Sequence, residues 1–208
     1  MTSIPFDARL ERILATTAKV FADKGFHSTT MRDLSRATGM SLAGLYHYIP
    51  GKDELLYLIQ KRCFSQVLAG AQEAIGDGRT PSERLESFIK HHVAFFASHM
   101  SEMKVLSHEA NSLDGDRLAD INALKRRYVE MLRGLVASVQ DDNGAQSDPQ
   151  VAAYALFGMM NWIYNWYNPS GALPPPALAE RFAQLFLFGL ASPAPAPTSA
   201  HSSSSSGG

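Results

Sequence analysis

A chain of 208 residues, of which 45% are hydrophobic and 19% charged, is too long for a disulfide-stapled miniprotein and too apolar for a disordered chain. Lys and Arg number 19 against 20 Asp and Glu, so the net charge of -1 excludes a global positive field, and any surface that binds nucleic acid must be local. The single cysteine, Cys63, excludes an intrachain disulfide and a multi-thiolate metal site, and the first residues lack an apolar stretch of signal-peptide length, so a cytoplasmic location is expected.

Helix signals recur along the whole chain, whereas sustained alternation of apolar and polar residues is absent. The fold class is therefore predicted to be all-α, with about nine helices. The first four helices are expected at residues 7–24, 31–38, 42–48 and 53–75. Thr30 and Asp33 form a carboxylate variant of the capping box, Ser41 caps the third helix, and Gly25 and Gly39 follow the ends of the first two.

The second half of the chain continues the helical pattern after a break at residues 76–78. Thr80 and Glu83 form a full capping box around Pro81, which takes the first helical position. The remaining five helices are expected at residues 81–99, 102–111, 116–140, 150–167 and 175–190. The polar tail at residues 192–208 is predicted to be disordered.

The most apolar run, residues 151–167, approaches the length needed to span a membrane. Asn161 and Asn165 interrupt it and no basic flank follows, so it predicts a buried helix, and no membrane partner is expected. Because apolar residues lie nearly all round this helix, we expect it to be buried on two sides.

Residues 30–49 have the dimensions of a helix-turn-helix, with a turn at residues 38–41 between two short helices. Gly39 permits the tight turn. The small core between the helices is expected to contain Met31, Leu34, Ala37, Met40, Leu45 and Ile49. The residues expected to point outward are Ser41, Leu42, Ala43, Tyr46 and His47. On spacing alone, an ordinary helical hairpin is the alternative.

Further residues occur at fixed spacing in and before this segment: Ile13-Leu14, Ala18, Phe21, Gly25, Thr29-Thr30, Ala37, Gly39, Ser41, Leu45-Tyr46-His47-Tyr48, Lys52-Asp53 and Leu55. This pattern resembles the amino-terminal domain of the TetR family of bacterial transcriptional repressors. The resemblance implies a DNA-binding domain over residues 7–67, with the helix-turn-helix at about 30–49. The later helices are similar to the family's effector-binding and dimerisation domain only in layout, which places that domain over residues 68–190.

The DNA-binding residues implied by the resemblance are Thr29, Thr30, Arg32, Ser41, Leu42, Ala43, Tyr46, His47 and Lys52. Among them, Thr30, Tyr46 and Lys52 are expected to contact phosphates. Ser41, Leu42, Ala43 and His47 would face base edges in the major groove. Leu42 and Ala43 depart from the polar residue and the glycine that are frequent in the family, which suggests contact with thymine methyl groups and leaves the operator sequence open.

Two arginines on the second helix, Arg32 and Arg36, are candidates for contacts to the DNA backbone, with solvated surface cations as the alternative for Arg36. In the TetR family the last two long helices resemble half of an intersubunit four-helix bundle. Phe182, Leu185, Phe186 and Phe188 fit such a bundle. The resemblance therefore implies a homodimer whose two recognition helices lie about one DNA turn apart on a palindromic operator.

The segment at residues 158–173 is also similar to a branch of TetR regulators that respond to acyl-CoA or related CoA thioesters and control fatty-acid or steroid degradation. The implied ligand-binding residues are Asn161, Trp162, Asn165, Trp166, Arg62, Arg126 and Arg127. The two tryptophans are spaced i, i+4, as are the two asparagines, whose buried amides would need partners such as a ligand carbonyl. The alternative is that the aromatic side chains pack in the dimer core and the asparagines bond to backbone.

Histidines 91, 92, 99 and 108 lack the spacing of metal ligands, so no metal or cofactor is expected and a pocket-lining or surface role is the default. Cys63 is expected to be a small buried hydrophobe. The sequence contains no nucleophile elbow, P-loop or dinucleotide fingerprint, which argues against an enzyme. An all-α carrier or sensor of small molecules that does not bind DNA is the remaining alternative.

Overall fold

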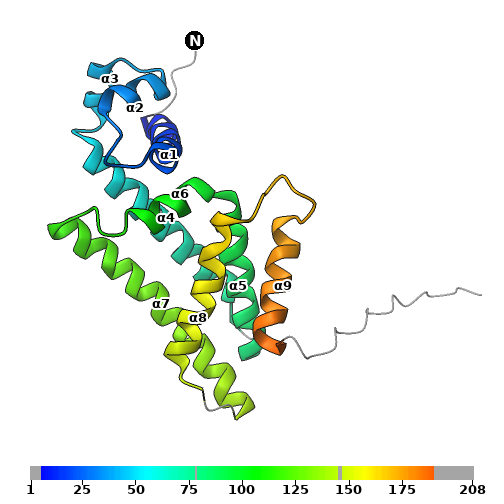
Figure 1. The fold of residues 1–208 in the computed structure, drawn as a ribbon. Coiled ribbons are helices and arrows are strands. Elements are labelled where there is room, and N and C mark those ends of the chain that lie inside the picture. The colour runs from blue at the N-terminus through cyan, green and yellow to red at the C-terminus, as the bar shows by residue number, and fades with distance from the viewer. Residues whose placement is uncertain (1–5, 78, 145–146, 190–208) are drawn as a thin grey trace, which may run out of the picture.

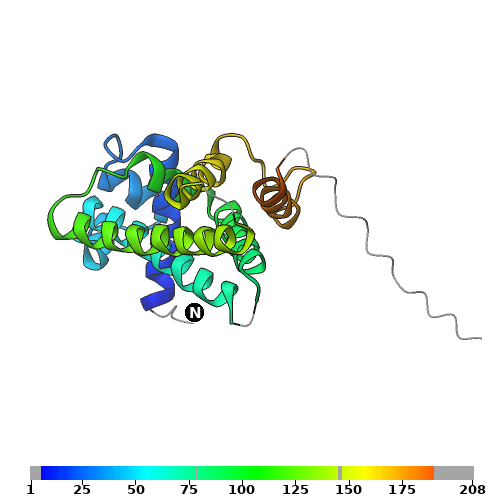
Figure 2. The ribbon, with the colours of Figure 1, turned by 90° about the horizontal axis from the view of Figure 1, so that it is seen from below.

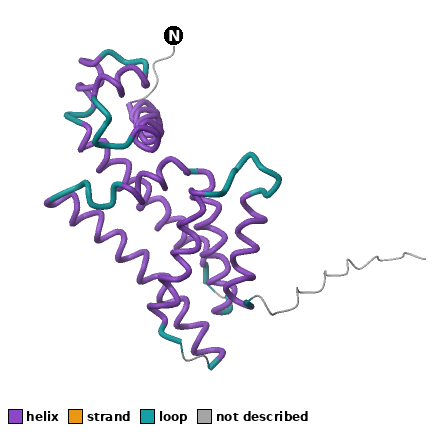
Figure 3. Tube along the Cα trace, viewed as in Figure 1, coloured by secondary structure: helices purple, strands orange, loops and turns teal. Residues whose placement is uncertain are grey.

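The chain folds into helices joined by short loops (Figures 1 and 3). The computed structural model describes residues 6–77, 79–144 and 147–189, and contains no strand in these ranges, so the predicted all-α class is confirmed. The helices are α1 (Phe6–Lys24), α2 (Met31–Thr38), α3 (Leu42–Tyr48), α4 (Lys52–Ile75), α5 (Pro81–Ser98), α6 (Met100–His108), α7 (Gly115–Asn143), α8 (Pro149–Asn161) and α9 (Pro175–Phe188), with a 3-10 turn, η1 (Trp162–Asn165), after α8. The tail at 192–208, predicted to be disordered, lies outside the described residues.

Two helices begin where the sequence places them because side chains cap their first turns. Thr30 and Asp33 form a reciprocal capping box at α2, and Thr80 and Glu83 form another at α5. Pro81 takes the first helical position of α5, where its missing N–H costs nothing. Each box bonds amides that the first helical turn leaves without a partner, which fixes the residue at which the helix starts.

The helix predicted over residues 150–167 ends early, at Asn161, and its last residues form the tighter turn η1. The Tyr167 amide donates to the carbonyl of Ile163, which closes this final turn. Pro169 follows shortly, and a proline disfavours helical geometry in the residue before it, so the chain must leave the helix here. The predicted end was therefore wrong, and the tryptophans expected on one α-helical face lie at and beyond the point where α8 ends.

The smaller end of the molecule contains α1, α2, α3 and the first part of α4 (Figure 1, blue to cyan). Its core consists of the buried side chains of Ile13, Leu14, Ala18, Phe21, Phe26, Leu34, Leu45, Ile49, Leu55, Leu56 and Ile59. The same core contains Val105 of α6, Leu113 of the loop after α6, and Ile121 of α7. The small unit is thus completed by side chains from the larger one.

The larger body packs around α5, which contacts α4, α7 and α9, while α8 packs on α7. Figure 2 shows α7 crossing one side of this body and α9 standing on the other side of α5. Phe88 of α5 is fully buried at its centre, with its ring 5.0 Å from that of Tyr128 and 6.2 Å from that of Phe157. These aromatic contacts join three helices around one core.

Helix α4 runs without interruption from the smaller core to the larger one. Leu55 and Ile59 belong to the smaller core, and Cys63 and Val67 to the larger. The predicted domain boundary between residues 67 and 68 falls inside this helix and stays a prediction. Cys63 is buried as expected, and burial raises the pKa of its thiol.

Exposed apolar side chains concentrate on α8, η1 and α9. Among the described residues, the large hydrophobic side chains that are exposed are Tyr46, Val151, Tyr154, Trp162, Trp166, Leu185 and Phe188. All but Tyr46 lie between α8 and α9. Within one chain α8 is therefore buried on one side only. Burial of its second side, which is expected against a partner subunit, stays a prediction. No described helix combines the length and hydropathy that a membrane crossing requires.

Candidate nucleic-acid interface and effector cavity

The helix-turn-helix is held by a left-handed glycine and a serine cap. Gly39, at φ +68°, ends α2 in a conformation that side chains rarely adopt. Ser41 accepts a hydrogen bond of 3.0 Å from the Gly44 amide and starts α3. Leu34 and Leu45 are fully buried between the two helices. The glycine turn, the serine cap and these two core residues together hold α3 at a fixed angle to α2.

The predicted core of this unit is largely confirmed. Leu34, Leu45 and Ile49 are buried, and Met31 and Met40 are half-buried. Ala37 is a correction: it is exposed, because it stands in the last turn of α2, where the chain leaves the helix at Gly39.

The outer face of α3 presents the side chains that the sequence analysis assigned to base reading. Ser41, Ala43, Tyr46 and His47 are exposed, and Leu42 is half-buried. Tyr46 keeps 48% of its surface exposed although it is a large aromatic residue. An exposed tyrosine hydroxyl can donate a hydrogen bond to a phosphate, and the small residues beside it let the helix approach DNA closely.

The Asp33 carboxylate, in the first turn of α2, accepts hydrogen bonds from two cations and a hydroxyl. Its carboxylate accepts from the Lys24 ammonium at 2.6 Å, the Thr30 hydroxyl at 2.7 Å and the Arg36 guanidinium at 3.0 Å. These bonds, that from Lys24 first, hold the pKa of Asp33 well below its usual range. Thr30 and Arg36 therefore have an intramolecular partner, while Arg32 lies exposed on the same helix.

The loop before α2 uses two of the predicted DNA-binding residues internally. Thr29 is buried, and its hydroxyl donates to the carbonyl of Gly25 at 2.7 Å, which turns the side chain away from solvent. The Lys52 ammonium donates to the carbonyls of Phe26, His27 and Thr29 at 3.0, 3.3 and 3.4 Å and lies 4.5 Å from the centre of the Phe26 ring. Lys52 thus clamps this loop, a role that sequence reasoning missed.

A cavity of about 360 Å³ lies in the larger body, between α5, α6, α7 and α8. Its apolar lining comes from Phe64, Phe96, Met103, Leu106, Ala110, Val129 and Phe157. Its polar lining comes from His92, Ser107, Lys125, Tyr128, Tyr154 and Asn161. An apolar cavity with a few converging polar groups has the make-up of a small-molecule site.

Three polar groups of this cavity form a chain of hydrogen bonds. The amide oxygen of Asn161 can only accept, so the Nε2–H of His92 donates to it, at 3.2 Å. The Tyr128 hydroxyl then donates to His92 Nδ1, at 3.0 Å. Burial lowers the pKa of His92 to about 3, so the ring is neutral at pH 7.

Lys125 is a half-buried cation in the same cavity wall. Its ammonium lies 5.5 Å from the centre of the Phe64 ring, and burial lowers its pKa. A half-buried cation beside an aromatic ring suits an anionic or strongly polar ligand group. Lys125 is not among the ligand-binding residues predicted from the sequence.

The predicted ligand-binding residues are only partly brought together. Asn161 lines the cavity. Trp162, Asn165 and Trp166 are exposed outside it, and Trp166 stacks on Phe182 of α9. Two of the three arginines, Arg126 and Arg127, are exposed on α7.

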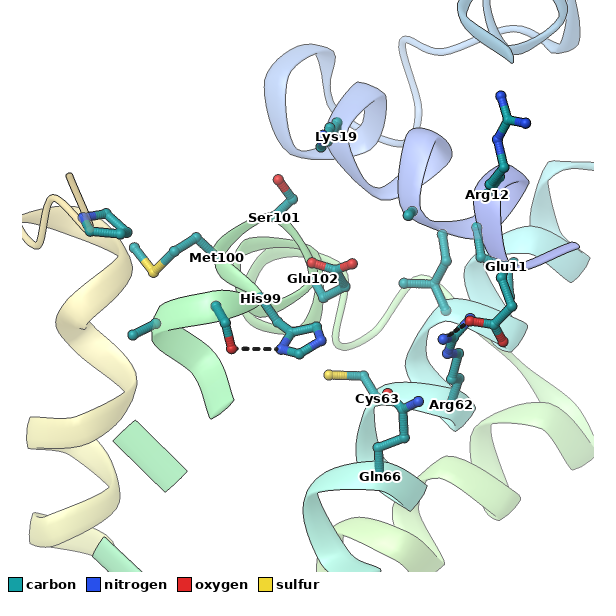
Figure 4. Close-up of a pocket in the computed structure, with 16 residues that line it drawn as sticks. Glu11, Arg12, Lys19, Arg62, Cys63, Gln66, His99, Met100, Ser101 and Glu102 are labelled. Atoms are coloured by element: carbon teal, nitrogen blue, oxygen red, sulfur yellow. Dashed lines mark hydrogen bonds and ion pairs between the residues drawn. The ribbon is translucent and has the colours of Figure 1, made fainter. Parts of the chain in front are cut away.

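Arg62 faces a different cleft, of about 760 Å³, between α1, α4 and the corner where α5 meets α6 (Figure 4). It forms an ion pair with Glu11, and Glu102 lies on the opposite wall. The His99 Nδ1–H donates to the carbonyl of Phe95 at 2.7 Å. Because charged side chains from several elements line this cleft, the apolar cavity is the better candidate for a hydrophobic ligand. The described residues contain no group of His, Cys, Asp or Glu that could hold a metal ion.

Tyr128 is a cavity residue that no sequence prediction included, whereas His92 lines the cavity in agreement with one of the two roles expected for it, pocket lining or surface. A signal for His92 exists, because Phe88, His92 and Phe96 follow each other at i, i+4 on α5. A polar ring on an otherwise aromatic helix face must find a buried partner. The partner, on a helix far along the chain, is not readable from that spacing.

Two family models match the chain. Residues 13–57 match the model described as bacterial regulatory proteins, tetR family. Residues 78–190 match the model described as the tetracyclin repressor-like C-terminal domain, which by itself covers more than half of the chain. The first match includes α2 and α3, and the second includes most of the cavity lining and α9.

Relatives and solved structures are similar over most of the chain. The HTH-type transcriptional repressor KstR2 of Rhodococcus jostii (strain RHA1) is 26% identical over 189 residues, 89% of this chain and 92% of the relative. The TetR family transcriptional regulator PfmR from Thermus thermophilus is 30% identical, with 86% of this chain and 98% of that one covered and a TM-score of 0.78. AibR in complex with isovaleryl coenzyme A and operator DNA is also 30% identical, with the same coverage and a TM-score of 0.77.

Proposed function

The chain belongs to the TetR family of bacterial regulatory proteins, and from this membership we propose that it binds a palindromic operator as a homodimer and releases it when a small hydrophobic effector enters the cavity. It is a transcriptional repressor of the TetR type and not an enzyme. The observation that carries the proposal is the exposed face of α3, held by a glycine turn and a serine cap at the end of the molecule away from α9 (Figure 1). A regulator of this kind is expected to work in the cytoplasm.

We infer that α3 enters the major groove and that each subunit reads one half-site. Ser41, Ala43 and His47 would face base edges, with Leu42 beside them, and Ala43 and Leu42 would favour thymine methyl groups. Tyr46, Thr30 and Arg32 would contact phosphates. Lys52 would act on phosphate through the loop that it clamps or from the helix amino terminus. Thr29 would support the same loop from inside, because its hydroxyl donates to the Gly25 carbonyl and its amide to the Phe26 carbonyl.

The homodimer is proposed on the exposed apolar side chains of α8, η1 and α9. Their concentration on one pair of helices is what an intersubunit four-helix bundle requires. Trp162 and Trp166 would lie at this interface, close to the rim of the cavity formed by Tyr154 and Asn161.

An acyl-CoA thioester is the effector class that the cavity supports best. The apolar lining suits an acyl chain, and a thioester carbonyl could replace one bond of the Tyr128–His92–Asn161 chain, because each member donates or accepts without charge. Lys125 would face an anionic part of the ligand. The similarity to AibR, solved with isovaleryl coenzyme A, names a first compound to test. Arg126 and Arg127 remain candidates for the nucleotide part, outside the cavity.

DNA binding is tested by selecting duplexes from a random pool with the full chain and measuring affinity by gel shift. Tyr46→Ala is expected to weaken binding about tenfold on every selected sequence, because it removes a phosphate contact. His47→Ala is expected to change which sequence is preferred. Arg133→Ala, on an exposed residue of α7 in the larger body, is the control. Selection of no duplex would instead favour the all-α carrier that does not bind DNA.

The effector class is tested by thermal stability with isovaleryl-CoA, a long-chain acyl-CoA, the free acids and CoA alone. A saturating thioester at about one hundred times its Kd is expected to stabilise the fold by about 3 kcal/mol, whereas free acid and CoA have smaller effects. His92→Phe should remove most of the thioester effect, while Arg133→Ala on the outer side of α7 should leave it. The absence of a shift with any thioester would remove this effector class and leave the DNA result standing.

A further inference from the structure

Helix α6 lies between the effector cavity and the helix-turn-helix unit. One side of it, with Leu106 and the following Ala110, forms part of the cavity wall. Its other side contacts α1, and Val105 is buried in the core of the smaller unit. Any change in the cavity that displaces α6 must therefore act on the smaller unit.

Glu109, directly after α6, bonds to the loop that leads into α2. Its carboxylate accepts from the Phe26 amide at 3.3 Å and from the Ser112 hydroxyl at 2.6 Å, and it lies 3.9 Å from His27 Nε2. Only 9% of the residue is exposed. Breaking the bond to Phe26 would leave a buried carboxylate short of a donor, so loop and carboxylate should move together.

The loop at residues 26–29 is held from two sides by opposite charges. The Lys52 ammonium of α4 donates hydrogen bonds to three backbone carbonyls of the loop, and the Glu109 carboxylate accepts one from the Phe26 amide. Thr30, the cap of α2, follows directly. A displacement of this loop changes where α2 begins, and α3 turns with α2 because Gly39 and the shared core connect them.

Where α4 meets the end of α6, one buried amide side chain has an acceptor atom without a hydrogen-bond partner in the described part of the chain. Gln60 of α4 is fully buried, and its Nε2 donates to the backbone carbonyl of Glu109 at 3.1 Å. The Gln60 Oε1 atom has no hydrogen-bond partner among the described residues. A buried amide with one unused acceptor can exchange bonds when its neighbour shifts, so the contact suits an element with two arrangements.

We propose that Glu109 is a positioning residue that relays occupancy of the cavity to the helix-turn-helix through the Phe26 amide. Ala110 lines the cavity and Glu109 precedes it, so the wall and the relay are adjacent residues. The proposal rests on the proposed function, because it assigns a route by which an occupied cavity lowers operator affinity.

The test fills the cavity by mutation, so that it does not depend on the identity of the effector. Val129→Trp places a large side chain into the cavity from α7, without altering any residue of α6. Ser107→Trp fills it from its exposed rim and serves as the second variant if the first does not fold. Operator affinity is measured for each in the Glu109 background and in Glu109→Ala, on duplexes selected with the unmodified protein.

Filling the cavity is expected to weaken operator binding about tenfold when Glu109 is present. In Glu109→Ala the same filling should change affinity by no more than about twofold, which gives a large coupling in the double-mutant cycle. Glu109→Gln keeps an acceptor for the Phe26 amide and should restore most of the response. Glu102→Ala, a glutamate of α6 that faces the other cleft, is the matched control and should respond like the unmodified protein.

Hydrogen exchange at the Phe26 amide gives a reading that needs no DNA. Filling the cavity is expected to speed exchange there when Glu109 is present, and Glu109→Ala should exchange fast whether the cavity is filled or not. Equal weakening of operator binding in both backgrounds, or no effect of a folded filling variant, would overturn the relay. Failure to select any duplex would count against the proposed function, while the exchange data would still decide the relay.

Discussion

His92 is the residue at which burial and ionisation conflict most directly. Its ring is fully buried and bonded at both nitrogens, to Tyr128 and Asn161. Both bonds suit the neutral ring with the proton on Nε2, and a second proton on Nδ1 would face a hydroxyl that already donates to it. With His92 neutral, the polar groups of the cavity carry no charge at this position, and a hydrogen bond between two of them could be replaced by one to an uncharged ligand carbonyl.

The buried state of His92 predicts a loss of stability in acid. Its pKa is lowered from 6.5 to about 3 by burial, so the unfolded chain takes up a proton below pH 6.5 that the folded chain refuses. The free energy of unfolding should therefore fall as pH decreases from 6.5 towards 3, by about 2 kcal/mol at pH 5. Urea denaturation at pH 7 and pH 5 measures this difference.

His92→Phe separates this contribution from that of the carboxylates. The difference in unfolding free energy between pH 7 and pH 5 should shrink by about 2 kcal/mol in this variant, whatever its stability at pH 7. Tyr128→Phe keeps the imidazole buried and should retain the dependence. An unchanged pH dependence in His92→Phe would show that water reaches the ring in the folded chain.

At the scale of the elements, Gly39 is the residue that the turn between α2 and α3 requires. Its φ of +68° is accessible to glycine without strain, whereas a side chain there is strained even though the space around it is open. Gly39→Ala should destabilise the fold by about 1 to 2 kcal/mol, as measured by denaturation. It should also weaken operator binding, because relief of the strain changes the angle of α3.

Gly134→Ala is the matched control. Gly134 lies inside α7, is exposed, and has open space where a Cβ would stand. The same substitution should stabilise the protein here by up to about 1 kcal/mol, because alanine is the better helix former. A loss of stability at both positions would mean that the turn conformation is not the cause at Gly39.

The elements that could be predicted from the sequence are those fixed by local chemistry. The capping boxes at Thr30 and Thr80 and the glycine at position 39 fixed helix boundaries, because each acts within a few residues. The end of α8 could not be predicted in this way. Trp162 and Trp166 continue an apolar helical pattern, and only the closure at Tyr167 ahead of Pro169 shows why the helix stops at Asn161.

The two candidate sites differ in the same respect. The DNA face is continuous in the sequence, so the motif identified Tyr46 and His47 and the structure exposes both. The cavity joins α5, α6, α7 and α8, and no local pattern says that Lys125 and His92 line one wall. Side-chain partners also escape the pattern, as the internal bonds of Thr29 and Lys52 demonstrate.

At the scale of the whole molecule, the two functional regions lie at different ends of a continuous framework. α4 runs through both cores, and α6 supplies Val105 to the smaller core while Leu106 lines the cavity. α8 and α9, which carry most of the exposed apolar side chains, lie in the part of the molecule away from α3 (Figure 1). This arrangement places the proposed dimer contact and the candidate effector cavity in the larger body and the proposed DNA contact in the smaller unit.

The proposed dimer predicts a defined effect of charge on that face. Val151→Glu combined with Leu185→Glu places carboxylates on the exposed apolar sides of α8 and α9, where a two-fold axis would bring like charges together. The variant is expected to be monomeric by light scattering at concentrations where the unmodified protein is dimeric. Ala119→Glu adds the same charge to an exposed position of α7 and should leave the dimer intact.

Salt dependence then tests whether two subunits share the work of binding DNA. If each subunit neutralises about two to four phosphates, the dimer should show a slope of log K against log salt of about -4 to -7, and the monomeric variant about half of that. The near-neutral net charge of -1 gives no other source for a steep slope, so cations such as Arg32 beside the recognition helix must supply it. Equal slopes for a dimer and a true monomer would mean that one subunit makes all the phosphate contacts.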